Sequence, residues 1–318
     1  MSMSSKSCWI VVEDGLTGTE NQCVGVAEAL GVSYEIKHIN YSDPWIALPQ
    51  CLRPDYSRIY SPQFDAPYPD LVIAGGRKST SASCYIKDKS KGSTFTVQLM
   101  DPYINPENFD LVAVPQHDKL RGDNVIVTLG APNLITEEQL NKARLSFAHI
   151  FESMPTPRIA VAIGGRSGTY TLKDKRLKKI IEKLKSLPGS LMITTSRRTG
   201  EENTQLLKDA LDNDENYFWN GQSPNPYLGM LAWANHILVT EDSVSMICEA
   251  ATTGKPVQTI QMDKGLQVSL GDTKFLRFHN YIRKKGIAKP FTGNLEHWTY
   301  EPLNDAQKVA DAIENAMK

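Results

Sequence analysis

The chain has 318 residues, of which 41% are hydrophobic and 22% charged, and its formal net charge at pH 7 is −1. These values are typical of a soluble globular protein with room for two domains, and the near-zero charge excludes a global attraction to nucleic acid or to an anionic membrane. No apolar run approaches the roughly 20 residues of a membrane-spanning helix, and no secretory signal is visible.

The first half of the chain alternates strand-like and helix-like segments. Residues 8–14 form a short apolar run, 15–21 a turn, and 22–31 a helical pattern that ends at Gly31, a residue suited to a helix C-cap. Further strands are expected at 33–40, 69–76, 94–101, 109–115 and 124–130, and a second helix at 79–87. This alternation favours an α/β fold, in which helices cover both faces of a parallel sheet.

The pattern restarts after a helix at 135–154, for which Thr136 is the candidate N-cap. Prolines at 155 and 157 mark a boundary, and a strand and an amphipathic helix at 173–187 follow. Four more strands are expected at 190–196, 216–221, 236–240 and 256–262. We therefore expect two domains with separate sheets, at about 1–152 and 153–318, and a terminal helix at 304–318 that could pack on either one.

Polar turns follow several of these strands, where parallel α/β sheets bind their ligands. The turn after residue 163 contains Gly164, Gly165, Arg166 and Ser167. Glycines let the backbone approach a phosphate, and the amides and the Ser167 hydroxyl can donate to it. A tight strand–helix turn without a ligand would need the same residues. The turn formed by Gly75, Gly76 and Arg77 has the same two interpretations.

Two arginines follow the strand at 190–196. Ser196, Arg197 and Arg198 suit a diphosphate or a carboxylate, because arginine forms strong charge-assisted hydrogen bonds with both. The alternative is a solvated loop whose arginines pair with Glu201 and Glu202.

The start of the first helix also carries polar side chains. Gly18, Asn21 and Gln22 lie in the turn 13–22, and the amide side chains could either cap the helix or hold a sugar hydroxyl.

Residues 239–257 read as a strand end, a turn and a helix. Asp242 or Ser243 could simply cap this helix. Alternatively, the helix N-terminus attracts an anion, and the polar side chains around it form the nucleotide-sugar end of an active site. That set consists of Glu241, Asp242, Ser243, Ser245 and Glu249.

The remaining reactive side chains give weaker indications. His117 is a possible general base with Asp118 nearby, although a loop histidine without function is more common. No metal-binding motif occurs, so no metal site is expected. The serine-containing turns lack G-x-S-x-G, which disfavours hydrolase chemistry. The five cysteines, Cys8, Cys23, Cys51, Cys84 and Cys248, have no zinc spacing and indicate reduced thiols in a cytoplasmic protein.

The stretch EDSVSMICEAATTGKPV resembles the signature of GT-B glycosyltransferases, in which two glutamates are separated by seven residues. The resemblance implies that Glu249 holds the ribose of a nucleotide and that the turn after Glu241 faces the diphosphate and sugar. The segments GLTGTENQCVGVAEALG and PDLVIAGGRKS are similar to the amino-terminal glycine turns of such enzymes, and IAVAIGGRSG to the first turn of their nucleotide domain. Asn21 stands where many of them have histidine, and Ser243 where many have glycine.

A wider resemblance covers nearly the whole chain. The motifs DGLTGTENQ, PDLVIAGGR, IGGRSGTY, TTSRRT, NPYLGMLAWANHILVTEDSVSM and EAATTGKPV resemble, in this order, the elongated-mitochondria family of mitochondrial fission factors. That family includes bacterial members of unknown activity. Its plant member is associated with recruiting a dynamin-related protein to the mitochondrial surface, which implies protein partners and leaves a peripheral membrane association open.

Together these observations predict a GT-B-like fold, with two Rossmann-like domains facing across a cleft. The expected function is glycosyltransferase-like binding of a nucleotide-diphosphate sugar, with no metal or other cofactor required and with an unknown acceptor. The expected donor-side residues are Gly164, Gly165, Arg166, Ser167, Ser196, Arg197, Arg198, Glu241, Asp242, Ser243, Ser245, Met246 and Glu249. The expected acceptor-side residues are Gly18, Asn21, Gln22, Gly75, Gly76 and Arg77.

The catalytic candidates are His117, Glu241 and Asp242. Two other functions remain open. One is a non-catalytic adaptor on the same fold, which binds protein partners. The other is a nucleotide-sugar epimerase that uses carboxylates and a histidine.

Overall fold

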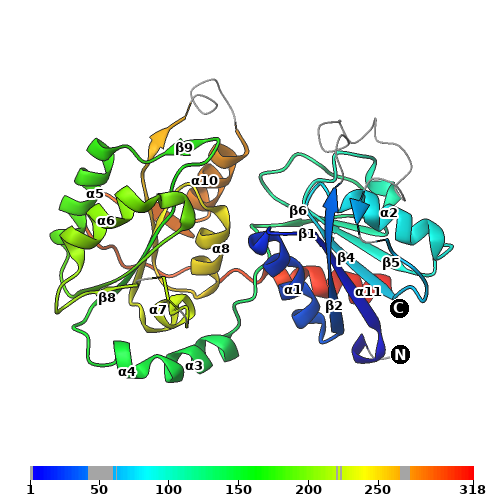
Figure 1. Cartoon of the computed structure of the whole chain (residues 1–318), viewed down its shortest axis with the longest axis horizontal. Coiled ribbons are helices and arrows are strands. Elements are labelled where there is room, and N and C mark those ends of the chain that lie inside the picture. Colours follow the sequence, from blue (N-terminus) through cyan, green and yellow to red (C-terminus); the bar gives the residue numbers. More distant parts are fainter. Residues whose placement is uncertain (1–2, 42–59, 62, 220, 223, 266–272) are drawn as a thin grey trace. The chain divides into compact units, whose positions relative to one another are not determined.

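The computed structural model describes residues 3–41, 60–61, 63–219, 221–222, 224–265 and 273–318. The chain forms two compact units, one of residues 1–134 and 304–318 and the other of residues 135–303 (Figure 1). Each unit has its own large sheet, so the prediction of two separate sheets is confirmed. Of the five cysteines, Cys51 lies outside the described residues and the other four are free thiols.

The first unit is built on a seven-stranded sheet with the order β3-β2-β1-β4-β5-β6-β7. Its neighbouring strands are parallel except for the antiparallel pair β2–β3. The strands are β1 (Ser7–Glu13), β2 (Ser33–Tyr41), β3 (Tyr60–Ser61), β4 (Leu71–Gly75), β5 (Phe95–Leu99), β6 (Leu111–Pro115) and β7 (Val125–Thr128). The helices are α1 (Thr17–Leu30), α2 (Thr80–Lys89) and α11 (Asp305–Ala316), with short 3-10 turns at Met3–Ser5 and Pro106–Asn108.

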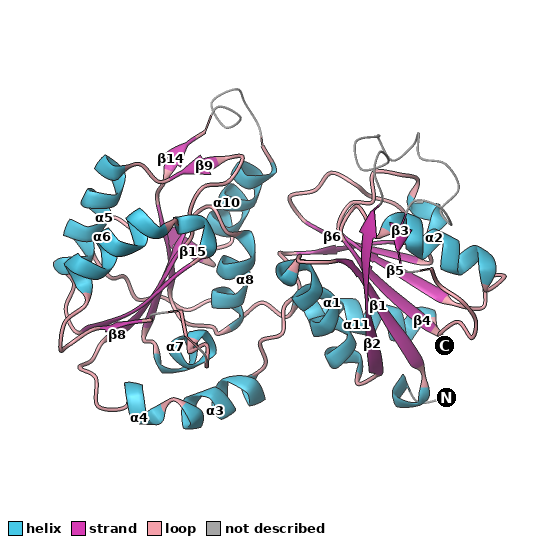
Figure 2. Cartoon of the chain, in the orientation of Figure 1, coloured by secondary structure: helices cyan, strands magenta, loops and turns pink. Residues whose placement is uncertain are grey.

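Alternation along the strands gives this sheet two buried faces. Ile10 and Val12 of β1 pack in a cluster with residues of α1 and α11, whereas Val11 packs in another cluster with α2. Because successive side chains of a strand point to opposite faces, helices must cover both sides, as Figure 2 shows.

The second unit contains a six-stranded, all-parallel sheet with the order β11-β10-β8-β12-β13-β15. Its strands are β8 (Arg158–Ile163), β10 (Ser190–Thr195), β11 (Tyr217–Phe218), β12 (His236–Thr240), β13 (Val257–Ile260) and β15 (Ala288–Pro290). A small antiparallel pair, β9 (Tyr170–Thr171) and β14 (Asp263–Lys264), stands apart from this sheet. Strand β12 lies between β8 and β13, in the interior of the sheet.

Helices also cover both faces of the second sheet. They are α3 (Glu137–Ser146), α4 (Ala148–Phe151), α5 (Asp174–Lys185), α6 (Glu201–Leu211), α7 (Tyr227–Trp233), α8 (Val244–Thr252) and α10 (Lys274–Lys284). The predicted amphipathic helix is α5, whose buried face consists of Leu177, Ile180 and Leu184. These residues share a core cluster with Ile159, Val161 and Ile163 of β8.

The division of the chain falls earlier than the expected boundary at residue 152. Helix α3 begins after Thr136, whose hydroxyl accepts a hydrogen bond from the Gln139 amide as predicted for an N-cap. It packs on α7 of the second unit, where the Trp233 indole donates to the Arg144 carbonyl at 2.9 Å. Helix α11 belongs to the first unit and packs on α1.

Two expected segments also differ in extent. Helix α1 begins at Thr17 instead of residue 22, because the amides of Thr19 and Glu20 already donate to the Leu16 carbonyl. The strand expected at 216–221 is limited to Tyr217–Phe218, and Asn220 lies outside the described residues. No described helix is both long and apolar enough to cross a membrane.

Candidate functional site

The candidate site lies at the carboxyl edge of the second sheet. Three turns meet there, after β8, β10 and β12, because these strands are parallel neighbours in the order β10-β8-β12. This is the edge at which α/β sheets bind ligands.

A buried carboxylate connects the three turns. Asp242, after β12, accepts a hydrogen bond from the Gly165 amide at 3.1 Å and forms an ion pair of 2.9 Å with the Arg198 guanidinium. The Asp242 side chain is 0% exposed and that of Arg198 is 43% exposed. Burial raises the pKa of Asp242, while the hydrogen bonds and the Arg198 charge oppose this rise. The arginine therefore compensates a carboxylate that would otherwise be costly to bury.

Close packing explains the two glycines after β8. A Cβ atom on Gly164 would overlap the Asp242 carboxylate, and one on Gly165 would overlap the backbone carbonyl of Arg198. The glycines thus allow the turns to approach one another, a requirement that exists with or without a ligand.

The backbone amides of this turn have protein acceptors, which corrects their expected role. We expected the amides of residues 164–167 to face a phosphate. Instead, Gly164 donates to the Thr240 hydroxyl at 2.6 Å and Gly165 to Asp242. The Arg166 amide donates to the Arg198 carbonyl, and the Ser167 amide to the Tyr170 carbonyl.

Hydrogen bonds within the protein also stabilise the turn after β10. Ser196 caps the 3-10 turn Arg197–Thr199, because its hydroxyl accepts from the Arg198 amide while its own amide donates to the Thr199 hydroxyl. Arg198 pairs with Asp242 and not with Glu201 or Glu202, the partners that the alternative interpretation suggested. The Arg197 side chain is exposed.

An open pocket of about 600 Å³ adjoins these turns. Its lining residues are Arg166, Ser167, Gly168, Thr171, Arg198 and Gly265. Arg166 and Arg198 thus line one pocket at the carboxyl ends of β8 and β10. Asp242, the ion-pair partner of Arg198, is buried and is not among the lining residues. Such a lining suits an anion with several oxygen atoms.

Helix α8 starts directly after Asp242. Ser243 is its N-cap, and its hydroxyl accepts from the Met246 amide at 3.4 Å, so the capping interpretation holds for this residue. Ser245, Met246 and Glu249 are partly exposed. Since Ser245 and Glu249 are four residues apart, they share one face of the helix.

Glu249 has a neighbour that the sequence did not reveal. Burial raises its pKa, and the nearby Tyr227 phenol of α7 lowers it. The Tyr227 phenol lies beside the Glu249 carboxylate, but its oxygen forms no hydrogen bond with any of the described residues. Tyr227 belongs to the NPYLGM motif, so its place in the motif was visible but its contact was not.

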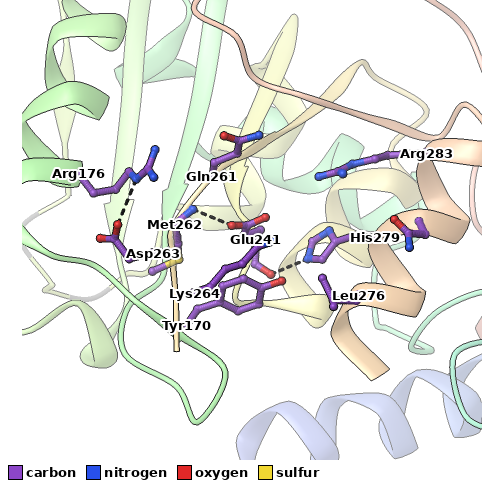
Figure 3. A pocket seen from close by; sticks show the side chains of 11 residues that line it. Tyr170, Arg176, Glu241, Gln261, Met262, Asp263, Lys264, Leu276, His279 and Arg283 are labelled. Carbon is purple, nitrogen blue, oxygen red and sulfur yellow. Dashed lines mark hydrogen bonds and ion pairs between the residues drawn. The ribbon is translucent and has the colours of Figure 1, made fainter. Parts of the chain in front are cut away.

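The two adjacent acids of this turn have separate environments. The Glu241 carboxylate accepts from the Met262 amide at 2.7 Å, and its backbone carbonyl accepts from His279 Nε2 at 2.7 Å (Figure 3). Asp242, in contrast, contacts Gly165 and Arg198. Glu241 therefore lines a different pocket from the one lined by Arg166 and Arg198.

In the first unit, the expected acceptor-side residues lie in two segments, the turn after β4 and the first part of α1. A Cβ atom on Gly75 would approach Cys23 Sγ to 2.5 Å, so this glycine allows α1 to pack against β4. Gly76 has a φ of 80°, which favours glycine, and its carbonyl accepts from Ser79 and Gln98. The Arg77 guanidinium lies over the Tyr103 ring, 5.6 Å from its centroid.

The other expected acceptor-side residues, Gly18, Asn21 and Gln22, lie inside α1 and so do not form a loop. His117 lies in the turn after β6, also in the first unit, and is 7% exposed. Across the described residues, no three His, Cys, Asp or Glu side chains form a group that could hold a metal ion.

Comparison with known proteins places the chain among relatives of one family. A family model described as "Mitochondrial fission ELM1" matches residues 17–317. The mitochondrial fission protein ELM1 of Arabidopsis thaliana is 28% identical, over 96% of this chain and 90% of the relative. An uncharacterized protein of Rickettsia prowazekii is 26% identical, over 98% of both.

Solved structures of similar fold include two UDP-GlcNAc 2-epimerases and MurG. The UDP-GlcNAc 2-epimerase of Methanocaldococcus jannaschii has a TM-score of 0.54 at 12% identity, covering 97% of this chain and 99% of that one. MurG of Acinetobacter baumannii has a TM-score of 0.50 at 14% identity, covering 98% and 99%. The UDP-GlcNAc 2-epimerase of Neisseria meningitidis, solved with UDP-GlcNAc, has a TM-score of 0.50 at 12% identity. The match covers 97% of this chain and 100% of that one. These likenesses confirm the GT-B-like fold.

Proposed function

The chain belongs to the mitochondrial fission ELM1 family, and from this premise we propose that its second unit binds a nucleotide-diphosphate sugar. The observation that carries the proposal is the pocket lined by Arg166 and Arg198 at the carboxyl edge of a parallel sheet. A protein of similar fold, the epimerase of N. meningitidis, was solved with UDP-GlcNAc bound.

In the proposed complex, the two arginines hold the diphosphate. The Asp242 ion pair positions Arg198 before the ligand arrives, and a guanidinium has five N–H donors, so the pair leaves donors for a phosphate. Arg166 forms no ion pair within the described part of the chain and contributes an uncompensated positive charge. These charges replace a metal ion at the diphosphate.

The ribose is assigned to Glu249. Its partly buried carboxylate lies beside Tyr227 and needs donors, which two ribose hydroxyls provide. Ser245, on the same face of α8, is placed to contact a neighbouring oxygen of the ligand.

The experiment is isothermal titration calorimetry of the full chain with UDP and UDP-GlcNAc. Arg166→Gln removes a charge without breaking a described ion pair, and it should weaken binding at least tenfold, about 1.4 kcal/mol. Arg197→Gln is the matched comparison, because Arg197 follows the same strand as Arg198 but does not line the pocket. Equal losses in both variants would mean that a diffuse basic edge, not this pocket, attracts the nucleotide. No binding of either ligand would refute the proposal.

The hydrogen bonds within the turn at residues 164–167 favour a second function, that of a non-catalytic adaptor, which binds its ligand without converting it. A turn whose four amides already have protein acceptors has none left for stabilising a leaving diphosphate. Product analysis of UDP-GlcNAc incubated with the chain separates the two functions. Release of UDP indicates transfer of the sugar to water, a changed sugar indicates epimerisation, and intact ligand contradicts both of these activities.

A further inference from the structure

A second pocket in the same unit has a composition that the nucleotide proposal does not explain. It measures about 310 Å³ and is bounded by β9, β14, α10 and the turn after β12 (Figure 3). Tyr170 of β9 lines this pocket, whereas the next residue, Thr171, lines the pocket that contains Arg166 and Arg198. Because successive side chains of a strand point to opposite faces, β9 separates the two pockets.

The floor of the pocket is buried and polar. His279 is 2% exposed, Glu241 is 7% exposed, and Tyr170 is 1% exposed. The imidazole lies beside Glu241, and its Nε2 must donate, because it is 2.7 Å from the Glu241 carbonyl oxygen (Figure 3). Burial lowers the pKa of His279 to about 4, so the ring is neutral at pH 7.

Neutral His279 leaves a buried acceptor unused. With the proton on Nε2, the other nitrogen, Nδ1, carries a lone pair. Among the residues that the structure describes, Nδ1 has no hydrogen-bond partner. An unsatisfied buried acceptor is costly, and a ligand with a hydroxyl group would satisfy it.

The rim of the pocket carries cations. Lys264 and Arg283 are exposed and form no ion pair within the described chain, whereas Arg176 pairs with Asp263 at 3.5 Å. Counting Glu241, the lining has three cationic and two anionic side chains, an excess of one positive charge. The amides of Gln261 and Asn280 complete a lining rich in hydrogen-bonding groups.

We propose that this pocket binds a monosaccharide with one anionic group, such as a sugar phosphate or a hexuronate, independently of the nucleotide site. The anionic group meets Lys264 and Arg283 at the rim, and the hydroxyls meet Glu241 and His279 Nδ1 at the floor. A simple anion such as sulfate offers no hydroxyl donor to the floor, and a neutral hexose leaves the rim charges unmet. The volume lies at the lower end of the range for small-molecule sites, as a monosaccharide requires.

Calorimetry on the full chain tests this with glucose 1-phosphate, glucuronate, glucose and sulfate. At least one of the two anionic sugars should bind at least tenfold more tightly than both glucose and sulfate, and the one that does so identifies the anionic group. Arg283→Gln should weaken that binding at least tenfold. Lys284→Gln, a neighbouring exposed cation on α10 outside the pocket lining, should leave it unchanged.

His279→Phe tests the floor, because it keeps a ring but removes both nitrogens, and its melting curve checks that the protein folds. It should weaken binding of the anionic sugar and leave affinity for sulfate unchanged. Arg166→Gln, in the other pocket, should change neither the affinity for the anionic sugar nor the affinity for sulfate. The proposal is overturned if neither anionic sugar exceeds glucose and sulfate, if Lys284→Gln equals Arg283→Gln, or if Arg166→Gln abolishes sugar binding.

Discussion

The Asp242 carboxylate ties the turns after β8 and β10 to its own turn after β12. It does so through the Gly165 amide and the Arg198 guanidinium. Because this carboxylate is fully buried, its partners must stay close, and any side chain at residue 165 would push Arg198 away. Interactions within the protein therefore set the geometry of the candidate site.

Gly165→Ala should accordingly destabilise the protein by about 1–3 kcal/mol, because the new methyl group overlaps the Arg198 backbone. Gly18→Ala is the matched control. It lies in α1 with no atom within 4 Å of the added Cβ, and it should be neutral or stabilise by up to about 1 kcal/mol. Urea unfolding measures both, and equal effects would contradict the packing argument.

His279 should make stability depend on pH. Its pKa is about 4 in the folded protein and about 6.5 in an unfolded chain, so only the unfolded state takes up a proton in between. The free energy of unfolding should therefore fall as pH decreases below about 6.5, by up to about 2 kcal/mol between pH 7 and pH 5. Burial raises the pKa values of Glu241 and Asp242, which acts in the opposite direction.

Comparison with His279→Gln isolates the histidine, because the acids remain in both proteins. Denaturant titrations at about pH 5 and pH 7 should show a smaller loss in the variant than in the parent. The same loss in both proteins would mean that His279 is not the group responsible.

The environments of Glu241 and Asp242 show the limit of sequence reasoning at this scale. The pattern correctly places both acids in one turn at the end of β12. Their partners lie far apart in the chain, at residues 262 and 279 for one and 165 and 198 for the other. Local pattern contains no information on such long-range contacts, so the separation of two pockets could not be predicted.

At the scale of elements, strands were easier to predict than short helices. The long apolar runs correspond to β1, β4, β8, β10 and β12, because a strand buried on both faces is recognisable from composition alone. Helix α7, in contrast, spans Tyr227–Trp233 and buries most of its length. A two-turn helix without a polar face shows no 3.6-residue periodicity, so the sequence does not predict it.

Helix α11 illustrates how one side chain fixes an element. Asp305, at its start, accepts from the amides of Leu129 and Gly130 at 2.8 and 2.7 Å. Asp305→Asn replaces one acceptor oxygen with an N–H group and leaves a buried amide unsatisfied. We expect a loss of about 1–3 kcal/mol in the free energy of unfolding.

The control is Asp311→Asn on the same helix. Asp311 is exposed and accepts only from the Gln307 side chain among the described residues, so its loss should stay within about 0.5 kcal/mol. Thermal unfolding measured by circular dichroism distinguishes the variants. A comparable shift in both would show that the charge on α11, and not the buried contact, matters.

At the scale of the whole molecule, the chain crosses between units twice. It leaves the first unit before α3 and returns to it at residue 304. The sequence indicates two α/β units and a free terminal helix, but the periodicity of α11 is compatible with either unit. The choice depends on the contacts with α1 and on the Asp305 hydrogen bonds, neither of which has a local signature.

A chain that ends at Leu303 should therefore lose the stability of the first unit while the second remains folded. Helix α11 contributes Val309 and Ile313, both 0% exposed, to the core of the first unit. Burial of such side chains is worth about 1.5–3 kcal/mol each. Their loss is large compared with the roughly 5–15 kcal/mol that stabilises a typical domain.

Hydrogen exchange read by mass spectrometry measures the two units separately. In the truncated chain, peptides from β1 and β4 should exchange faster by a factor of at least 100, which corresponds to about 2.7 kcal/mol of lost protection. Peptides from β8 and β10 should keep the protection that they have in the full chain, because the residues that form their core cluster all precede residue 304. Faster exchange in both sheets would show that the units unfold together, and unchanged exchange in both would show that α11 is dispensable for the first.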